Sequence, residues 1–237
     1  MKKLPKHLQL HKFKNRSALA EALANEIAHQ LDRSIQMHGK ASLAVSGGST
    51  PVELFKALSQ AELPWAAVKI TLVDERWVSP NEARSNERLV REHLLVSRAA
   101  FARFVPLYRE GMSAKEAEPI VETAISAIPQ PMDVVVLGMG NDGHTASFFP
   151  DAKNLTALTD PFGCHLVQAV DASSAGEARM TMTLPFIAAG RFIALHIEGD
   201  EKRKALNMAL EEGEANDMPV RHILRREDVY TNIFWAP

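Results

Sequence analysis

The chain has 237 residues, of which 46% are hydrophobic and 24% are charged, the proportions of an ordinary globular protein. Its 27 Lys and Arg residues nearly balance its 29 Asp and Glu residues, so the net charge of −2 gives no long-range attraction for nucleic acid or an anionic membrane. The single cysteine excludes an intramolecular disulfide framework. The basic start of the chain, Met1 to Pro5, has no apolar stretch behind it, and no window approaches the roughly 20 apolar residues that cross a bilayer. We therefore expect a soluble, cytoplasmic protein with no secretory signal, no nucleic-acid or membrane partner and no obligate protein partner.

Apolar spacing predicts the elements in chain order. Leu8, Leu10 and Phe13 suggest a strand, and apolar residues at every fourth position predict a helix over 17–38, with Ser17 as its cap and Gly39 after its end. Further helices are predicted at about 51–61, 85–97, 113–127 and 200–212. Short apolar runs predict strands at 42–45, 70–73, 134–137, 192–197 and 229–235, with a weaker candidate at 165–170.

Strands that are apolar on both faces and alternate with helices are typical of a parallel sheet covered on both sides. The sequence therefore predicts an α/β fold with a doubly wound, mostly parallel sheet and helices on both faces, in a single domain over residues 1–237. In such folds ligands bind beyond the carboxyl ends of the strands, so the residues after each strand are the candidates for a site.

The first such candidate follows the strand at 42–45. It consists of Ser46, Gly47, Gly48, Ser49 and Thr50. Thr50 and Glu53 have the spacing of a capping box, and Pro51 falls at the first helical position, so we expect a helix to begin here. The two glycines let backbone N–H groups approach an anion such as a phosphate, although a tight turn that binds nothing has the same pattern. No Gly-Lys-Ser/Thr follows, which excludes a Walker loop.

Charged residues follow two other strands. Asp74, Glu75 and Arg76 come after the strand at 70–73, where three charges are costly unless they are paired or face a cleft. The arginine could hold a carboxylate or phosphate, or could form an ordinary surface pair with the glutamate. Lys202 lies in the first turn of the helix at 200–212, where it opposes the helix dipole. A bound anion would remove that conflict, and solvation of the lysine would explain it equally.

A glycine-rich segment, residues 138–150, follows the strand at 134–137. It opens with G-x-G-x-x-G, but Pro150 leaves only about two helical turns after Gly143, too few for the crossover helix of a dinucleotide-binding unit. What remains is Asp142 two residues before His144 at a strand exit. Imidazoles titrate near neutral pH, so His144 is a candidate general base.

Other site types have little support in the sequence. His7 and His11 would not converge on a metal from a strand, and there is no HExxH motif or cysteine pair, so no metal site is predicted. A G-x-S-x-G nucleophile motif is absent. Cys164 has no neighbour that marks it as a nucleophile, and we expect it to be a packing residue.

Four segments together resemble the 6-phosphogluconolactonase family. They are SGGSTP (46–51), DERWV (74–78) with the following Ser85 and Asn86, GMGNDGHTASFFP (138–150) and EGDEK (198–202). The likeness runs in the expected order from about Ser42 to the C-terminus. The wider superfamily includes glucosamine-6-phosphate deaminases, which have a different segment after DGH and a DEY-like motif in place of Asp74-Glu75-Arg76. Both differences favour the lactonase.

The resemblance implies hydrolysis of 6-phospho-D-glucono-1,5-lactone in the oxidative pentose phosphate pathway, without a metal or organic cofactor. It implies that His144 deprotonates water, with Asp142 orienting it or shaping the loop. Arg76 and the backbone of Gly47 and Gly48 would contact the sugar or the oxyanion, and Lys202 and Arg179 would hold the phosphate. The candidate substrate-binding residues are Ser46, Gly47, Gly48, Ser49, Thr50, Asp74, Arg76, Gly143, Arg179 and Lys202.

Three alternatives remain open. An amino-sugar phosphate deaminase or isomerase would release ammonia from glucosamine 6-phosphate. A non-catalytic sugar-phosphate sensor would bind its ligand without turnover. A nicotinamide oxidoreductase would bind NAD(P).

Overall fold

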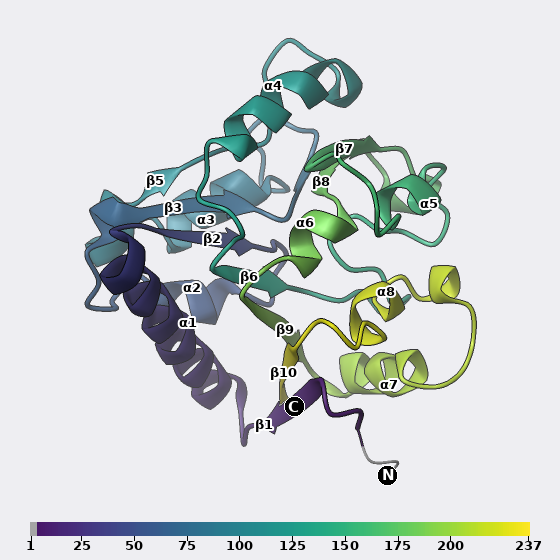
Figure 1. Ribbon diagram of the computed structural model, residues 1–237, viewed down its shortest axis with the longest axis horizontal. Coiled ribbons are helices and arrows are strands. Elements are labelled where there is room, and N and C mark those ends of the chain that lie inside the picture. The colour runs from purple at the N-terminus through teal and green to yellow at the C-terminus, as the bar shows by residue number, and fades with distance from the viewer. Residues whose placement is uncertain (1–3) are drawn as a thin grey trace.

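A parallel sheet forms the centre of the molecule in the computed structural model, which describes residues 4–237. In this described part, seven strands lie in the order β1-β10-β9-β6-β2-β3-β5, and every neighbouring pair is parallel. Figure 1 shows this order from β5 at the upper left to β1 at the bottom. The strands are β1 (Leu8–Lys12), β2 (Ala41–Val45), β3 (Val68–Leu72), β5 (Arg103–Phe104), β6 (Val134–Leu137), β9 (Phe192–Glu198) and β10 (Thr231–Ala236).

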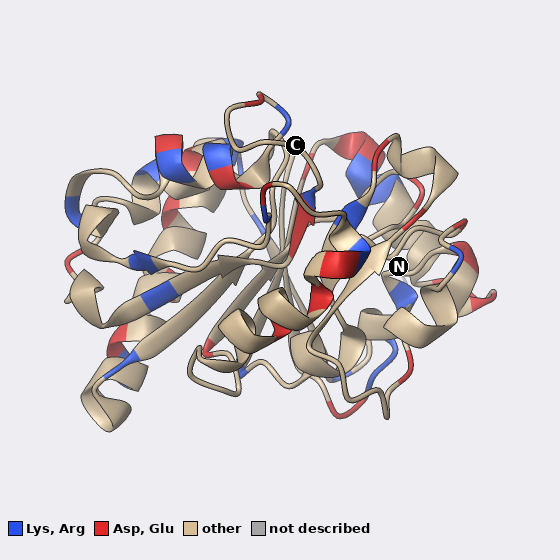
Figure 2. Cartoon of the chain, turned by 90° about the horizontal axis from the view of Figure 1, so that it is seen from above, with Lys and Arg blue, Asp and Glu red and all other residues tan. Residues whose placement is uncertain are grey.

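Helices flank this sheet on both sides, as the view from above shows (Figure 2). They are α1 (Arg16–His38), α2 (Val52–Leu58), α3 (Asn86–His93), α4 (Ala114–Ser126), α5 (Leu155–Leu158), α6 (Leu184–Ala188), α7 (Asp200–Ala209) and α8 (Arg221–Leu224). The α/β fold class predicted from the sequence is therefore confirmed. Among the described residues, none of these helices has the length and apolar character needed to cross a membrane.

The longest helix, α1, has the packing expected from its apolar period. Its fourth-position residues Leu19, Leu23, Ile27 and Leu31 are all fully buried. Gly39 ends the helix in the left-handed conformation, with φ of 71°, as predicted.

Two predicted helix caps are wrong. The Asn15 side chain, rather than Ser17, caps α1 by accepting a hydrogen bond from Ala18 N at 2.9 Å. At α2, no side chain makes a cap hydrogen bond and the helix begins at Val52, so the predicted Thr50–Glu53 capping box is not formed. The loop before α2 is therefore held by contacts other than helix capping.

A small antiparallel sheet, absent from the prediction, stands beside the main one. Its strands are β4 (Asp74–Arg76), β8 (Arg179–Met182) and β7 (Val167–Val170), in that order. The weak strand candidate at 165–170 corresponds to β7. The small sheet pairs Arg76 with Arg179, so two basic residues far apart in the sequence become neighbours.

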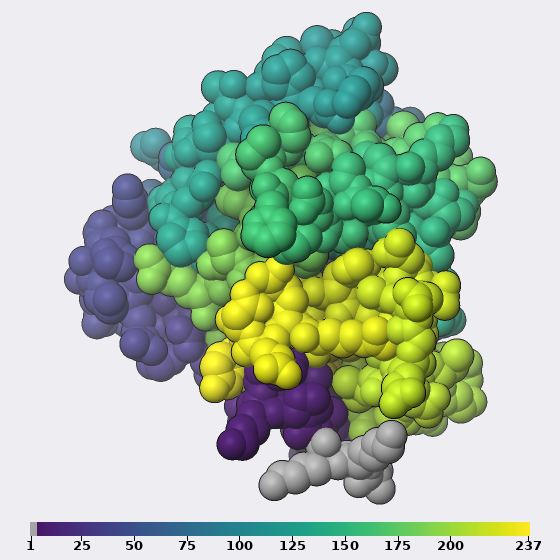
Figure 3. All heavy atoms as spheres, turned by 45° about the vertical axis from the view of Figure 1, so that its right-hand side comes forward, coloured from purple at the N-terminus to yellow at the C-terminus, as the bar shows by residue number. Residues whose placement is uncertain are grey.

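The two ends of the chain meet at one edge of the main sheet. β1 pairs with β10, and the space-filling view shows the purple N-terminal segment against the yellow C-terminal residues (Figure 3). The expected strand around Leu8 and Leu10 is thus confirmed, with His7 Nε2 hydrogen-bonded to Leu224 O at 3.0 Å. The expectation about a secretory signal falls in part on residues 1–3, which lie outside the described residues. Cys164 is exposed, so the expectation that it packs in the interior is wrong.

The strand order creates a switch point between β2 and β6. From β2 the chain continues outward through β3 to β5, whereas from β6 it continues through β9 to β10 on the other side. Loops that leave neighbouring strands at such a point diverge and leave a crevice at the carboxyl edge of the sheet. The glycine-containing segments after β2 and β6 both leave the sheet here.

Candidate active site

A cavity of about 240 Å³ lies at this switch point. Its walls come from the ends of β2, β6 and β9, from β4 and β8 of the small sheet, and from the first turns of α3 and α7. Its lining residues are Ser46, Gly47, Gly48, Ser49, Thr50, Pro51, Asp74, Arg76, Asn86, Gly138, Met139, Gly140, His144, Ala146, Arg179, His196, Ile197 and Lys202.

The loop after β2 forms one wall of the cavity. Ser46 continues the sheet by donating its N–H to Val136 O at 3.0 Å, which ties this loop to β6. Gly48 has φ of 89°, a conformation that side chains with a Cβ rarely adopt. A Cβ on Gly47 would collide with the Asn86 side-chain amide, so only glycine allows α3 to approach this closely. Gly48 is therefore required by its backbone conformation, and Gly47 by the close approach of the Asn86 side chain.

His144 and Asp142 form a hydrogen-bonded pair on the loop after β6. His144 Nδ1 lies 2.7 Å from Asp142 Oδ1, and the same oxygen accepts the His144 backbone N–H at 3.1 Å. A Cβ on Gly140 would overlap the imidazole, and the Gly140 N–H donates to His144 O at 2.8 Å. The ring also packs against Phe149, with centroids 4.5 Å apart. These contacts fix the ring with its Nδ1 toward the carboxylate, so Nε2 is the nitrogen left for other chemistry.

The pair also changes the ionisation of the carboxyl. Burial raises the pKa of Asp142, but its hydrogen bond to His144 and the attraction of that ring outweigh burial and hold the pKa below its usual value. Asp142 is thus a carboxylate at neutral pH, the state that orients an imidazole through an Nδ1–H donor.

Three basic side chains line the same cavity: Arg76, Arg179 and Lys202. Arg179 is buried; its Nη2 donates to Ala175 O at 2.9 Å, and its guanidinium lies over the Phe149 ring at 5.5 Å. Burial lowers the pKa of Arg179 from its very high ordinary value and lowers that of Lys202, which Asp142 partly counteracts. An anion in the cavity would therefore meet partly desolvated cations, where attraction is stronger than in water.

Two buried carboxyl groups follow β3. Asp74 lines the cavity, and its Oδ2 accepts a hydrogen bond from Ser147 Oγ at 2.6 Å. Glu75 is fully buried behind it, and burial raises the pKa of Glu75 to about 7 against the lowering effect of backbone hydrogen bonds from Asn86, Glu87 and Arg76.

The structure brings ten of the twelve predicted site residues to the cavity lining: Ser46, Gly47, Gly48, Ser49, Thr50, Asp74, Arg76, His144, Arg179 and Lys202. The other two, Asp142 and Gly143, do not line it. Asp142 acts on the cavity only indirectly, by its hydrogen bond to His144, which does line it. Gly143 has φ of 79° and packs against Met218, so it shapes the turn, and its predicted contact with substrate stays a prediction.

Sequence reasoning missed two polar residues of the lining, Asn86 and His196. His196 is buried, and its Nε2 lies 3.1 Å from Glu198 Oε1. The signal for it was an ionisable residue inside the apolar run 192–197, near the end of β9. Asn86 belongs to one of the segments that carry the family resemblance, but its place in the lining depends on how α3 docks against the loop after β2.

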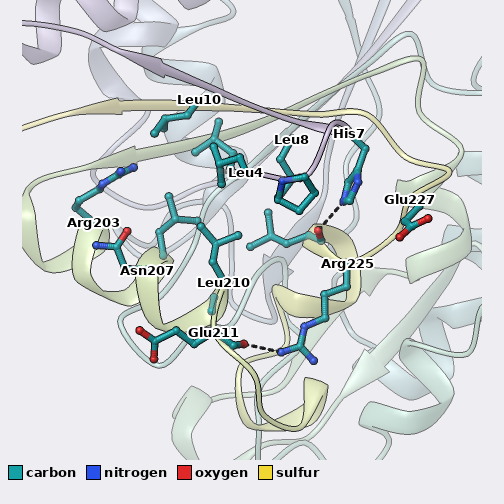
Figure 4. A pocket seen from close by; sticks show the side chains of 15 residues that line it. Leu4, His7, Leu8, Leu10, Arg203, Asn207, Leu210, Glu211, Arg225 and Glu227 are labelled. Carbon is teal, nitrogen blue, oxygen red and sulfur yellow. Dashed lines mark hydrogen bonds between the residues drawn. The ribbon is translucent and has the colours of Figure 1, made fainter. Parts of the chain in front are cut away.

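A larger cavity of about 670 Å³ lies elsewhere, between β1, β10, α7 and α8 (Figure 4). Leucine side chains from these elements dominate it, among them Leu4, Leu8 and Leu210. Neither His144 nor any of the three cavity cations lines it. The smaller cavity at the switch point is therefore the better candidate for polar chemistry.

Comparison with known proteins identifies the family of the chain. A family model described as glucosamine-6-phosphate isomerases/6-phosphogluconolactonase matches residues 14–235. The chain belongs to this family. A 6-phosphogluconolactonase of Rhizobium meliloti (strain 1021) is 47% identical over 228 residues, covering 96% of this chain and 98% of the relative. One of Pseudomonas aeruginosa is 40% identical over 235 residues, covering 99% of this chain and 98% of that protein.

Solved structures of other proteins show the same fold. The crystal structure of a 6-phosphogluconolactonase from Shewanella baltica has a TM-score of 0.95 and 40% identity, covering 99% of this chain and all (100%) of that one. A monomeric glucosamine-6-phosphate deaminase has a TM-score of 0.77 at 16% identity, covering 96% of this chain and 97% of that one, and this likeness shows the fold alone. The family fold thus accommodates more than one chemistry, and the residues of the site must distinguish them.

Proposed function

We propose that this protein hydrolyses 6-phospho-D-glucono-1,5-lactone to 6-phospho-D-gluconate, a step of the oxidative pentose phosphate pathway. The observation that supports the proposal most is the Asp142–His144 pair, whose imidazole faces a cavity shared with Arg76, Arg179 and Lys202. Lactone hydrolysis needs a base, a group that stabilises an oxyanion and a grip on a distant phosphate. Relatives of 40% and 47% identity over nearly the whole chain carry the name of this activity.

His144 acts as the general base in this proposal. Asp142 accepts the Nδ1–H and thereby leaves the lone pair on Nε2, which takes a proton from a water molecule. The hydroxide attacks the lactone carbonyl carbon, and the carbonyl electron pair moves to its oxygen. When the carbonyl re-forms, the bond from this carbon to the ring oxygen breaks, and the ring oxygen takes the proton back from the imidazolium. The product is the open-chain acid, which ionises in water.

The oxyanion and the sugar face the wall formed by β4 and the loop after β2. Arg76 and the N–H groups of Gly47 and Gly48 supply donors there, and such donors are worth most in a cavity that excludes water. Asp74 holds Ser147 with one oxygen, which leaves its other oxygen to accept a sugar hydroxyl. These assignments put the reacting carbon of the substrate beside β4 and the loop after β2, and leave its phosphate end to other residues of the cavity.

The phosphate lies between Arg179 and Lys202. Arg179 offers the guanidinium N–H groups other than those of Nη2, which is bonded to Ala175 O and lies 3.1 Å from Glu177 Oε1, and Lys202 adds a charge in the first turn of α7. The alternative amino-sugar deaminase chemistry would require release of ammonia from glucosamine 6-phosphate.

The test compares enzyme-dependent with spontaneous hydrolysis, because δ-lactones also open in plain water. Freshly generated 6-phosphogluconolactone is followed at neutral pH with and without the purified protein. We expect acceleration that is proportional to enzyme concentration, and no ammonia from glucosamine 6-phosphate. Equal rates with and without protein, or ammonia release, would contradict the proposal.

A further inference from the structure

The strand β4 presents its three residues to two different environments. Side chains alternate along a strand, so Asp74 and Arg76 share one face, and both line the cavity. Glu75 points the other way; it is fully buried and does not line the cavity. Because it cannot touch a ligand there, it takes no part in the chemistry described above.

The carboxylate of Glu75 is nevertheless extensively hydrogen-bonded. It accepts the backbone N–H groups of Asn86 at 2.8 Å and Glu87 at 2.7 Å, the Ser85 hydroxyl at 3.1 Å, and the N–H of its neighbour Arg76 at 2.7 Å. The first two donors belong to the first turn of α3, where N–H groups lack partners within the helix. A buried carboxylate is costly, and these bonds offset part of the cost, although the pKa of Glu75 remains raised.

The residues before and after Glu75 are tied to the same segment. Asn86 Nδ2 donates to Asp74 O at 2.9 Å, and Arg76 Nη1 donates to Arg84 O at 2.6 Å. Each of the three residues of β4 is therefore bonded to residues 84–87, which we call the 84–87 bracket. Asn86 also packs so closely against Gly47 that no Cβ fits between them. The bracket thus connects β4, α3 and the loop after β2, which are three walls of the cavity.

We propose that Glu75 is a positioning residue, which holds the 84–87 bracket against β4 and thereby fixes the Arg76 guanidinium and the Asn86 amide at the cavity wall. This inference rests on the proposed function, because it assigns Glu75 to the same reaction through Arg76. It also means that the N–H groups at the start of α3 are already used by Glu75 and do not bind substrate.

Replacement of Glu75 by glutamine tests the proposal with little change of volume. Glutamine keeps one carbonyl oxygen and places an NH₂ group where the other oxygen was, so one of the two acceptor oxygens is lost and two of the four donors face an NH₂ group. We expect Glu75→Gln to lower kcat/KM for the lactone about tenfold, with most of the loss in kcat. The matched control is Glu116→Gln, because Glu116 also caps a helix start, by accepting from Ser113, but is exposed and does not line the cavity.

A double-mutant cycle separates positioning from a general loss of structure. If Glu75 acts through Arg76, Glu75→Gln costs less than threefold in an Arg76→Ala background and about tenfold in a Lys202→Ala background. The same loss in both backgrounds, or no loss in the otherwise unchanged enzyme, overturns the proposal. Should Glu75→Gln fail to fold, Ser85→Ala removes the hydroxyl that donates to Glu75 and that also caps α3 by accepting from Arg88 N. The cycle then predicts a smaller loss, about threefold, that again disappears without Arg76. An unchanged kcat/KM in Ser85→Ala would overturn the proposal equally.

The rate of amide hydrogen exchange at residues 86 and 87 measures how firmly the 84–87 bracket is held, and it does not depend on the reaction. We expect Glu75→Gln to speed exchange at Asn86 and Glu87 at least tenfold, whereas Glu116→Gln leaves both unchanged. Unchanged exchange in Glu75→Gln overturns the proposal even if the enzyme is a lactonase. An unaltered protein that does not hydrolyse the lactone would refute the proposed function instead, and the exchange result would still decide whether Glu75 holds the bracket.

Discussion

Replacement of Asp142 by asparagine is the perturbation whose size follows most directly from the geometry of the site. Asp142 Oδ1 accepts both the imidazole Nδ1–H and the His144 backbone N–H, at 2.7 and 3.1 Å. Asparagine keeps one such oxygen but loses the charge, and its NH₂ group can donate to Nδ1. That hydrogen bond would stabilise the tautomer with the proton on Nε2, which is the form that cannot accept a proton from water.

The magnitude follows from the hydrogen bond and its exposure. A hydrogen bond to a charged group contributes about 1.5–3 kcal/mol, and the Asp142 side chain is 44% exposed, so we take the lower end of that range. Since about 1.4 kcal/mol corresponds to a factor of ten in rate, kcat should fall by roughly ten- to thirtyfold, with KM within about twofold of its original value.

The assay measures lactone hydrolysis above the spontaneous rate for Asp142→Asn and for a matched Asp228→Asn control. Asp228 is also an exposed aspartate with one close partner, Arg226 Nη2 at 2.6 Å, and it does not line the cavity. The control should keep its full kcat. A kcat for Asp142→Asn within twofold of the unaltered enzyme would refute the view that Asp142 orients the base.

Three further predictions concern other walls of the cavity. Lys202→Ala should mainly raise KM for the phosphorylated lactone in steady-state kinetics, and an unchanged KM in a folded variant would place phosphate binding elsewhere. Gly47→Ala forces a Cβ into the Asn86 amide, so thermal unfolding should show a loss of about 1–3 kcal/mol, together with at least a tenfold lower kcat/KM; a fully active variant would mean that the wall yields easily. Glu75 has a pKa of about 7 in the folded protein against 4.5 ordinarily, so folding favours its protonated form and its contribution to stability is lost as the pH rises. The free energy of unfolding of the unaltered protein, minus that of Glu75→Gln, should fall by up to roughly 3 kcal/mol between about pH 4.5 and 7 in denaturant titrations, and a difference that rises with pH would contradict the burial effect.

Six of the seven strands of the main sheet could be predicted because they are marked by local sequence, whereas the two-residue strand β5 was not predicted. Runs such as Val134–Leu137 are apolar on both faces, which is typical of strands covered by helices on both sides. The period of α1 and Gly39 after it were equally clear. Helix starts were less predictable, since Asn15 and Ser17 are both suitable capping residues. The backbone is extended at Asn15, and this conformation, which the sequence does not reveal, makes Asn15 the cap.

The small sheet could not be predicted from local pattern. Strand β4 has only three residues, all charged, and it pairs with β8 across about a hundred positions of sequence, while β8 also pairs with β7. The same long-range pairing places Arg179 beside Arg76, which the order of residues alone does not reveal. Asn86 and the bonds of Glu75 depend on the docking of α3, so the strand-exit rule located the cavity but not the contacts that hold its walls.

The most direct test of the central claim is kcat for His144→Ala on freshly generated 6-phosphogluconolactone, corrected for spontaneous opening. His29→Ala, at an exposed position of α1, serves as the matched histidine control. General-base catalysis by His144 predicts a loss of about 10²-fold or more for His144→Ala in a folded protein, which is the usual contribution of such a base, and none for His29→Ala. Turnover by His144→Ala close to that of the unaltered protein would contradict it.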